Sequence, residues 1–150
     1  MILVNNIKLT VYIKVDEEPV EKIKQKMIEL APFNLADEKI VLKEETTQGF
    51  NEKIIKIFII ELIKEKHTND FLEFLNSKLT NEQKILLSSQ KESRLDEALF
   101  FFIRFDKTEL IENNKFFITD SGNCFHIKMS IASFPRKRAV ALQVVDKIFK

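Results

Sequence analysis

Residues that break regular structure are scarce in this sequence, which has two glycines and three prolines among 150 positions. Because long loops are rich in such residues, most of the chain is expected to lie in helices and strands. The length suits one ordinary domain that buries its own hydrophobic core. Since no internal repeat, low-complexity segment or linker interrupts the sequence, we predict a single domain over residues 1–150.

Strict alternation of apolar and polar side chains identifies a half-buried strand at residues 7–15. Residues 53–65 fit either a helix or a strand, and we predict a strand because β-branched residues dominate and Gly49 lies just upstream. The segment ALFFFIRF at residues 98–105 is a third strand, and the short mixed segment at residues 38–45 is a fourth.

The sequence DSGN at residues 120–123 is typical of a tight turn, in which Gly122 supplies the positive φ. Residues 115–119 and 124–132 on either side of this turn are rich in β-branched and aromatic side chains. We therefore predict that these two segments pair directly as a hairpin.

Four helices are predicted from capping residues and from apolar residues at helical spacing. They begin after Asp16, at Thr68, at Thr80 with a capping box to Gln83, and at Pro135. Pro32 ends the first of them. The resulting order, β-α-β-β-α-α-β-β-β-α, indicates an α+β fold with a single antiparallel or mixed sheet of about five or six strands and helices mainly on one face.

The parity of the apolar residues predicts which side chains face these helices. The covered face should hold Ile7, Leu9, Val11, Leu99, Phe101, Ile103, Phe125, Ile127 and Ile131. Phe58, Ile60, Phe100 and Phe102 have the opposite parity, and strands that are apolar on both sides are normally covered on both. We therefore expect a helix or a second copy of the chain, in a symmetric homodimer, to cover them.

Composition bounds the location and the partners. The chain has 24 basic and 23 acidic residues, so any basic surface must come from segregation of charge and not from its total. Cys124 is the only cysteine, which excludes an intramolecular disulfide. The longest apolar stretch, residues 54–63, contains two charges and is shorter than the roughly 20 residues of a membrane span. We expect a cytoplasmic protein with no membrane partner.

No catalytic motif is present: the sequence has no glycine-rich phosphate loop, no nucleophile elbow and no paired-histidine zinc motif. Cys124 and His126 share a strand face without further ligands, and His67 is interpreted as a solvated residue at a helix start. The carboxylates of Asp96, Glu97 and Asp106 are too few to enclose a cation, so structural roles are favoured. We predict no enzyme activity, no cofactor and no metal.

The cluster that stands out is basic. Arg136, Lys137 and Arg138 precede the last helix, where cations oppose the helix dipole and do not serve helix stability. Arg94, Arg104 and Lys107 flank the strand at residues 98–105. These residues are compatible with an anion site at a helix start and with a solvated basic turn. For the adjacent run of Phe100, Phe101 and Phe102, packing is favoured over stacking on bases.

The segments RLDEALFFFIRFDK, KFFITDSGNCFHIKMSIA and SFPRKR resemble an uncharacterised archaeal family that is predicted to bind RNA and, in some accounts, to associate with the exosome. Arg94–Glu97, Arg104–Lys107, Phe134, Pro135 and Lys137 match its pattern. Phe134 replaces an expected tyrosine, and residues 112–114 replace a glycine-containing turn. The resemblance implies a fold similar to the RNA-binding domain of the ribosomal protein that holds the small RNA of the large subunit.

Two functions remain open. The first is a non-enzymatic protein that binds structured RNA weakly, by shape, through a basic edge made of Arg94, Arg104, Lys107, Arg136, Lys137 and Arg138. The alternative is a protein-interaction module that keeps an RNA-binding-like fold without RNA activity.

Overall fold

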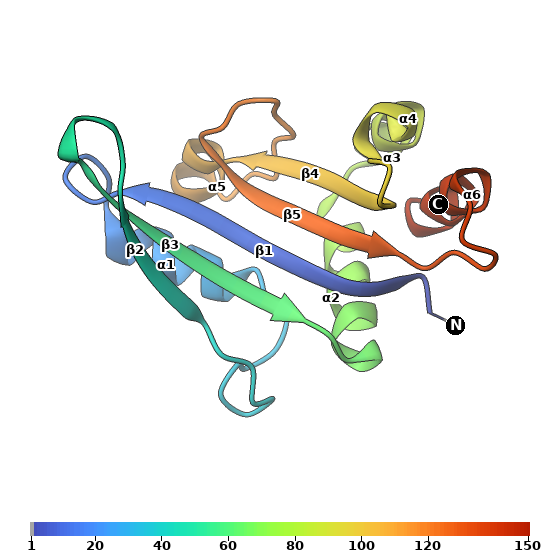
Figure 1. The fold of residues 1–150 in the computed structure, drawn as a ribbon, viewed down its shortest axis with the longest axis horizontal. Helices are drawn as coiled ribbons and strands as arrows, with labels where there is room; N and C mark the ends of the chain where they lie inside the picture. Colours follow the sequence, from blue (N-terminus) through green and yellow to red (C-terminus); the bar gives the residue numbers. More distant parts are fainter. Residues whose placement is uncertain (1) are drawn as a thin grey trace. The chain divides into compact units, whose positions relative to one another are not determined.

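The structure, a computed structural model, describes residues 2–150. Five strands form one open antiparallel sheet in the order β2-β3-β1-β5-β4 (Figure 1). The strands are β1 (Val4–Lys14), β2 (Lys43–Gln48), β3 (Ile54–Leu62), β4 (Phe100–Asp106) and β5 (Cys124–Ile131). The helices are α1 (Val20–Glu29), α2 (Glu65–Lys78), α3 (Asn81–Ser89), α4 (Lys91–Arg94), α5 (Lys107–Asn113) and α6 (Arg138–Ile148). The predicted α+β fold is confirmed.

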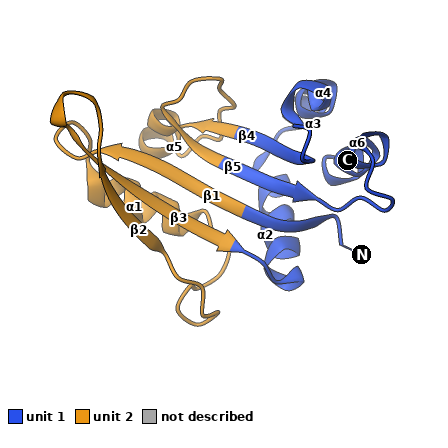
Figure 2. Cartoon of the chain, viewed as in Figure 1, with its two compact units in different colours: residues 1–7, 62–103, 127–150 blue, residues 8–61, 104–126 orange. Residues whose placement is uncertain are grey.

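The chain divides into two compact units, which Figure 2 colours separately. Unit 1 consists of residues 1–7, 62–103 and 127–150, and unit 2 consists of residues 8–61 and 104–126. The division runs through β1, β4 and β5. The single domain over residues 1–150 stays a prediction. No helix formed by residues 2–150 is long and apolar enough to cross a membrane.

Each unit has a core built on the predicted alternation. In unit 2, Leu9 and Val11 of β1 are buried while Tyr12 is exposed, and Ile23 and Met27 of α1 add to the core. Figure 1 shows α1 behind β1 and β3 in this unit. In unit 1, the rings of Phe101 and Phe149 lie 5.6 Å apart. All nine side chains that were expected on the covered face are buried.

The predicted parity of β3 is wrong. Phe58 and Ile60 were expected on the face opposite to the helices, under a further helix or a second copy of the chain, but both are fully buried and Phe58 lies against Lys24 of α1. The neighbouring Ile57 is only half-buried, so Phe58, Ile60 and Leu62 form the most deeply buried row of β3. A segment that is apolar at almost every position gives no parity of its own, and packing against α1 shows which face is covered, since the ammonium of Lys24 lies 5.8 Å from the Phe58 ring centroid.

The predicted hairpin is also wrong. Residues 115–119 form no strand, and their single bridge, Ile118 to Phe105, joins them to β4 and not to β5. The unpredicted helix α5 and the loop that follows it separate β4 from β5 along the chain. Gly122 does not adopt a positive φ. Side chains stabilise the turn instead, because Thr119 Oγ1 and Ser121 Oγ accept backbone N–H groups two residues further on.

Helix starts were predicted with mixed success. Thr80 and Gln83 form the expected capping box at α3, with hydrogen bonds of 3.1 and 2.9 Å. Asp16 does not cap α1, which begins at Val20 after an intervening turn. The second helix begins at Glu65, ahead of the expected Thr68, and places His67 in the core, so the solvated interpretation of this histidine is wrong.

Candidate nucleic-acid interface

The loop before α6 presents the basic run to solvent. Residues 134–139 are all exposed, directly after the buried residues at the end of β5. Ser133 holds the loop in place, because its hydroxyl lies 2.7 Å from the Pro135 carbonyl and accepts the backbone N–H of Lys137 at 3.2 Å. The first turn of α6 contains no acidic residue and has no side-chain cap. The positive end of this helix therefore adds to the charge of the loop.

The three cations of this loop have different surroundings. Arg138 donates to the backbone carbonyls of Glu92 and Leu95 at 2.6 and 3.0 Å, so most of its guanidinium is occupied. Arg136 makes one such bond, of 3.2 Å, to the carbonyl of Ala98. Within residues 2–150 the ammonium of Lys137 has no hydrogen bond or ion pair. Arg136 and Lys137 consequently keep donors that face solvent.

Arg94 lies beside the same segment. Its Nε donates to the Gln90 side chain at 2.9 Å, and its Nη1 donates to the carbonyl of Phe102 at 3.3 Å. Arg136 and Arg138 contact the backbone between these two partners, so the basic side chains gather around residues 90–102. We call this cluster in unit 1 the basic edge; it consists of Arg94, Arg136, Lys137 and Arg138.

Charge is segregated between the two units. Unit 1 has 12 basic and 8 acidic residues, a formal charge of +4, whereas unit 2 has 12 basic and 15 acidic residues, a formal charge of −3. Residues 127–150 contain six basic residues and a single acidic one, Asp146. Asp146 accepts hydrogen bonds from Lys91 and Ser88 at 2.5 and 2.6 Å, and these bonds lower the pKa of its carboxyl group. The near-neutral net charge of the whole chain is therefore the sum of a basic unit 1 and an acidic unit 2.

The other two basic candidates belong to unit 2 and differ from each other. Arg104 is exposed and donates to the carbonyl of Asp120 at 3.0 Å. Lys107 is buried, and its ammonium lies 2.6 Å from the Tyr12 carbonyl and 2.8 Å from the Glu18 carboxylate. A buried, paired ammonium is not available to a phosphate. No sequence signal marks this pairing, because Glu18 and Lys107 are 89 positions apart.

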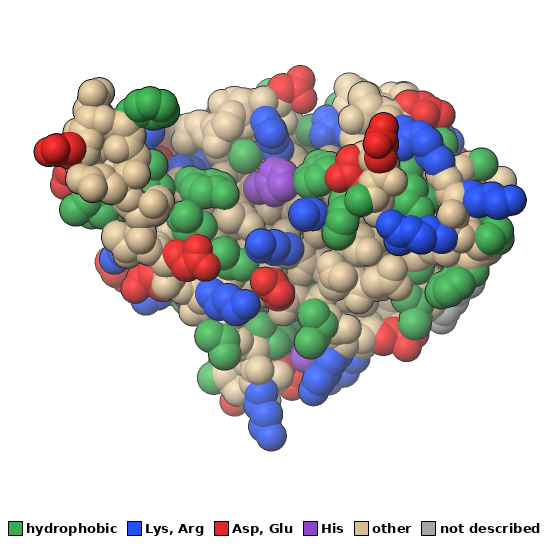
Figure 3. Space-filling view, viewed as in Figure 1, with side chains coloured by type: hydrophobic (Ala, Val, Ile, Leu, Met, Phe, Trp, Pro, Cys, Tyr) green, Lys and Arg blue, Asp and Glu red, His purple; other side chains and the backbone are tan. Residues whose placement is uncertain are grey.

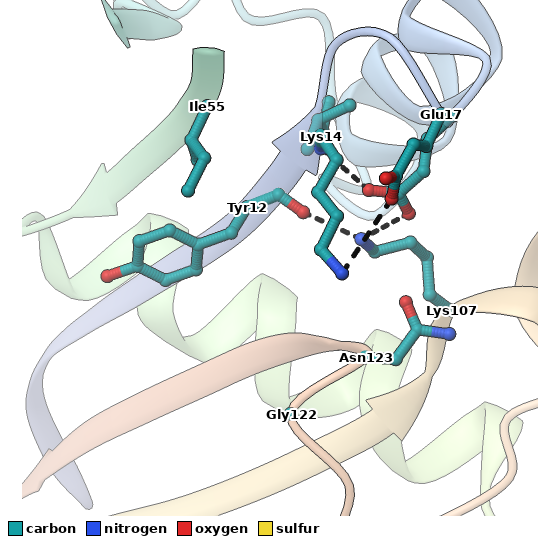
Figure 4. Close-up of a pocket in the computed structure, with 9 residues that line it drawn as sticks. Tyr12, Lys14, Glu17, Ile55, Lys107, Gly122 and Asn123 are labelled. Carbon is teal, nitrogen blue, oxygen red and sulfur yellow. Dashed lines mark hydrogen bonds and ion pairs between the residues drawn. The ribbon is translucent and has the colours of Figure 1, made fainter. Parts of the chain in front are cut away.

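A cavity of about 430 Å³ in unit 2 lies next to this ion pair (Figure 4). Figure 4 shows the Lys107 ammonium directed at the Tyr12 carbonyl, with Lys14 and Glu17 beside it. Lys14 and Glu17 are themselves 3.8 Å apart, so the charged groups of the cavity neutralise one another. The cavity therefore offers no excess cation to an anionic ligand.

The remaining polar clusters have structural roles. Asp96 accepts the backbone N–H of Phe100 at 2.9 Å, and Asp106 caps α5 by accepting that of Glu109. Burial raises the pKa of the Cys124 thiol, and nearby cations only partly offset this effect. Within residues 2–150, no group of three or more His, Cys, Asp or Glu side chains is placed to hold a metal ion.

Unit 1 has an aromatic and basic surface whose cation, Lys128, was not predicted from the sequence. Packing explains Phe101, which is fully buried, but Phe100 and Phe102 are only half-buried. The Nζ of Lys128 lies 4.2 Å from the ring centroid of Phe100 and 6.0 Å from that of Phe102. Over the part of the molecule that belongs to unit 1, Figure 3 shows basic side chains next to hydrophobic ones. The alternation along β4 separates Phe100 and Phe102 from Phe101, as predicted from the sequence, but no local pattern pairs these rings with Lys128 of β5.

The open antiparallel sheet and its helices define an α+β protein, which carries an exposed basic loop. Solved structures share this fold. Protein AF2318 from Archaeoglobus fulgidus, of family DUF54, is 21% identical with a TM-score of 0.84, covering 97% of this chain and 99% of that one. The DUF54 protein Mth689 from Methanothermobacter thermautotrophicus is 20% identical with a TM-score of 0.76, covering 99% of both chains.

Residues 6–131 match a protein family described as RNA binding, and this chain belongs to that family. It is also similar to the RNA-binding protein PAB1135 from Pyrococcus abyssi (strain GE5 / Orsay), with 24% identity over 141 residues. That match covers 94% of this chain and 90% of the relative.

Proposed function

We propose that this protein binds RNA without catalysing a reaction, through phosphate contacts of the basic edge. The observation that carries the proposal is the segment at residues 134–139, from the loop into the start of α6, which is exposed throughout and contains three cations and no acidic residue. Membership of the RNA-binding family and the name of the Pyrococcus relative support the same role. The excess of positive charge in unit 1 supplies the attraction that the whole chain lacks.

The members of the basic edge have separate roles in this proposal. Lys137 and Arg136 contact phosphate oxygens, because both side chains have donors that face solvent. The N-terminus of α6 adds a positive partial charge at the same place. Arg94 and Arg138 mainly position the loop against residues 90–102, since their guanidinium groups already hold backbone carbonyls. Arg104, exposed in unit 2, is a separate candidate phosphate contact of that unit, and Lys107 is left out because it is buried.

The small number of cations predicts weak binding that depends on salt. Each neutralised phosphate contributes a slope of about 0.7 to 0.9 to the fall of log affinity with log salt. With about two or three such contacts we expect micromolar binding at best at low salt and little at physiological salt. Phosphate contacts follow the course of the backbone and not the bases, so this edge selects RNA by shape.

The test is fluorescence anisotropy with a labelled RNA hairpin at about 50 mM and about 200 mM salt. The variant Arg136→Glu with Lys137→Glu should abolish binding at low salt. The matched control is Lys147→Glu with Lys150→Glu, which makes the same charge change at exposed positions at the other end of α6. Equal losses of RNA affinity in both variants would show that net charge, and not the position of the cations, determines binding. Absence of binding by the wild-type protein would favour the protein-interaction module instead.

The resemblance also implies association with the exosome and a fold similar to a ribosomal RNA-binding domain. Both stay predictions, as do the cytoplasmic location and the homodimer. Pull-down of exosome subunits by the wild-type protein, and not by the Arg136→Glu Lys137→Glu variant, would connect such an association to the basic edge.

A further inference from the structure

The open side of β4 in unit 1 has two aromatic rings where water-facing side chains are normal. Phe101 and Ile103 are fully buried, so Phe100 and Phe102 point to the opposite side of the strand, where they are half-buried. A strand that faces water on one side normally alternates apolar with polar residues. The two rings are separated by two residues of strand, roughly 7 Å along its axis.

Lys128 of β5 covers these rings in the free protein. Its Nζ is 4.2 Å from the centroid of Phe100, which is within the range of a cation–π contact, and 6.0 Å from that of Phe102. Within residues 2–150 no carboxylate pairs with this ammonium. The charge of Lys128 therefore remains available to an anion that approaches the ring faces.

We propose that Phe100 and Phe102 form a stacking platform for unpaired RNA bases, and that Lys128 moves from the rings to the adjoining phosphate when a base binds. The platform deepens the proposed RNA binding and rests on it. The occupant is an unpaired stretch of RNA, because a base offers its face to an aromatic ring only when it is not stacked within a duplex.

Interaction strengths favour this exchange. A cation–π contact at an exposed site contributes about 0.5–1 kcal/mol, whereas a base stacked on an aromatic side chain contributes about 1–3 kcal/mol. Replacing the ammonium by a base is therefore favourable, and the displaced ammonium gains a phosphate contact. The charge of unit 1, +4 from 12 basic and 8 acidic residues, suits an anionic occupant better than an apolar peptide.

The basic edge adjoins the platform. Arg94 donates to the carbonyl of Phe102, and Arg136 donates to that of Ala98, two residues before Phe100. Phosphates bound at the basic edge would thus hold an RNA strand beside the two rings. Phosphate contacts at the edge and stacking at the platform make separable contributions to affinity.

The test compares two RNA probes of equal length: an oligouridylate of about eight nucleotides and a duplex. The variant Phe100→Leu with Phe102→Leu keeps apolar side chains but removes the aromatic faces. It should lose about tenfold or more in affinity for the oligouridylate and change less than about twofold for the duplex. Lys128→Met should lower the salt slope of oligouridylate binding by about 0.7.

Unit 1 also contains a matched control. Phe74 of α2 is half-buried and has the ammonium of Lys78 5.6 Å from its ring centroid. Phe74→Leu with Lys78→Met should leave the affinity for both probes unchanged. Ring-proton NMR shifts of Phe100 and Phe102 on addition of oligouridylate, absent with inorganic phosphate, would report stacking directly.

The outcomes separate this inference from the proposed function. Duplex binding that depends on Arg136 and Lys137 would support the proposed RNA binding. If the Phe100→Leu Phe102→Leu variant then keeps its affinity for the oligouridylate, the stacking platform is overturned. Equal losses for both probes would likewise overturn it, since they would indicate a general disturbance of unit 1. If the wild-type protein binds neither probe, both proposals fail together.

Discussion

The ammonium of Lys107, at the start of α5, lies 2.8 Å from the carboxylate of Glu18 in the turn before α1. The Lys107 side chain is only 7% exposed and that of Glu18 is 20% exposed. Glu18 also accepts the backbone N–H of Lys14 at 2.7 Å, and Lys107 donates to the Tyr12 carbonyl. The pair thus ties α5 to the end of β1, which gives Lys107 a structural role within unit 2.

Lys107→Met should destabilise the protein by about 3 kcal/mol, because it leaves the shielded Glu18 carboxylate without its partner. Urea denaturation followed by circular dichroism measures this change. Lys43→Met is the control, since Lys43 and Glu61 form an exposed pair at 3.5 Å in the same unit that contributes less than about 1 kcal/mol. Equal effects of the two substitutions would contradict the structural role of Lys107.

Arg138→Ala should lower the free energy of unfolding by about 1–2 kcal/mol, because it leaves the carbonyls of Glu92 and Leu95 without their donor. Lys137→Ala, one residue away, should change stability by less than about 0.5 kcal/mol, since its ammonium has no partner within residues 2–150. Thermal melts of the two variants measure the difference. Equal, small losses would show that Arg138 is as solvated as Lys137 and does not hold the loop.

Asp146 gives a pH dependence of known sign. Hydrogen bonds from Lys91 and Ser88 lower the pKa of its carboxyl group in the folded state. Its contribution is therefore present above the unfolded pKa of about 3.9 and is lost as pH falls through the lower folded value. The side chain is 42% exposed, so this contribution is less than about 1 kcal/mol.

The stability of Asp146→Asn should therefore fall less than that of the wild-type protein between neutral and acidic pH. Urea denaturation midpoints at each pH measure this difference. Lys91→Met should act in the same direction, and the double variant should add nothing further. Additive effects of the two changes would show that the Lys91–Asp146 contact does not cause the dependence.

Local sequence signals predicted the local features of the fold. The capping box between Thr80 and Gln83 needs only neighbouring residues, and it is present as expected. Alternation identified β1 because one of its faces is polar. In β3 nearly every residue is apolar, so the burial of Phe58 and Ile60 depends on packing against distant segments such as α1 and not on a local pattern. Asp106 was weighed as a metal-binding carboxylate, whereas it caps a short helix.

The sequence predicted which basic residues form the candidate site, but not which of them hold the fold and which face solvent. The run from Arg136 to Arg138 is visible in the sequence, yet the acceptors that hold Arg138 lie 43 and 46 positions away. The Lys128 contacts with Phe100 and Phe102 depend on the pairing of β4 with β5, which the predicted hairpin misplaced. Contacts between distant segments decide which cation already holds protein acceptors, and no local pattern contains them.

Salt dependence separates cations that bind phosphate from cations that hold the fold. Lys137→Ala removes a solvent-facing ammonium from the proposed RNA contacts, so the slope of log affinity against log salt should fall by about 0.7 to 0.9. Lys107→Met removes the same charge from a buried site, so it should leave the slope unchanged at temperatures where the variant is folded. Titrations of a labelled RNA hairpin between about 25 and 150 mM salt measure both slopes. A reduced slope for Lys107→Met would place that ammonium in contact with RNA and contradict the assignment of the basic edge.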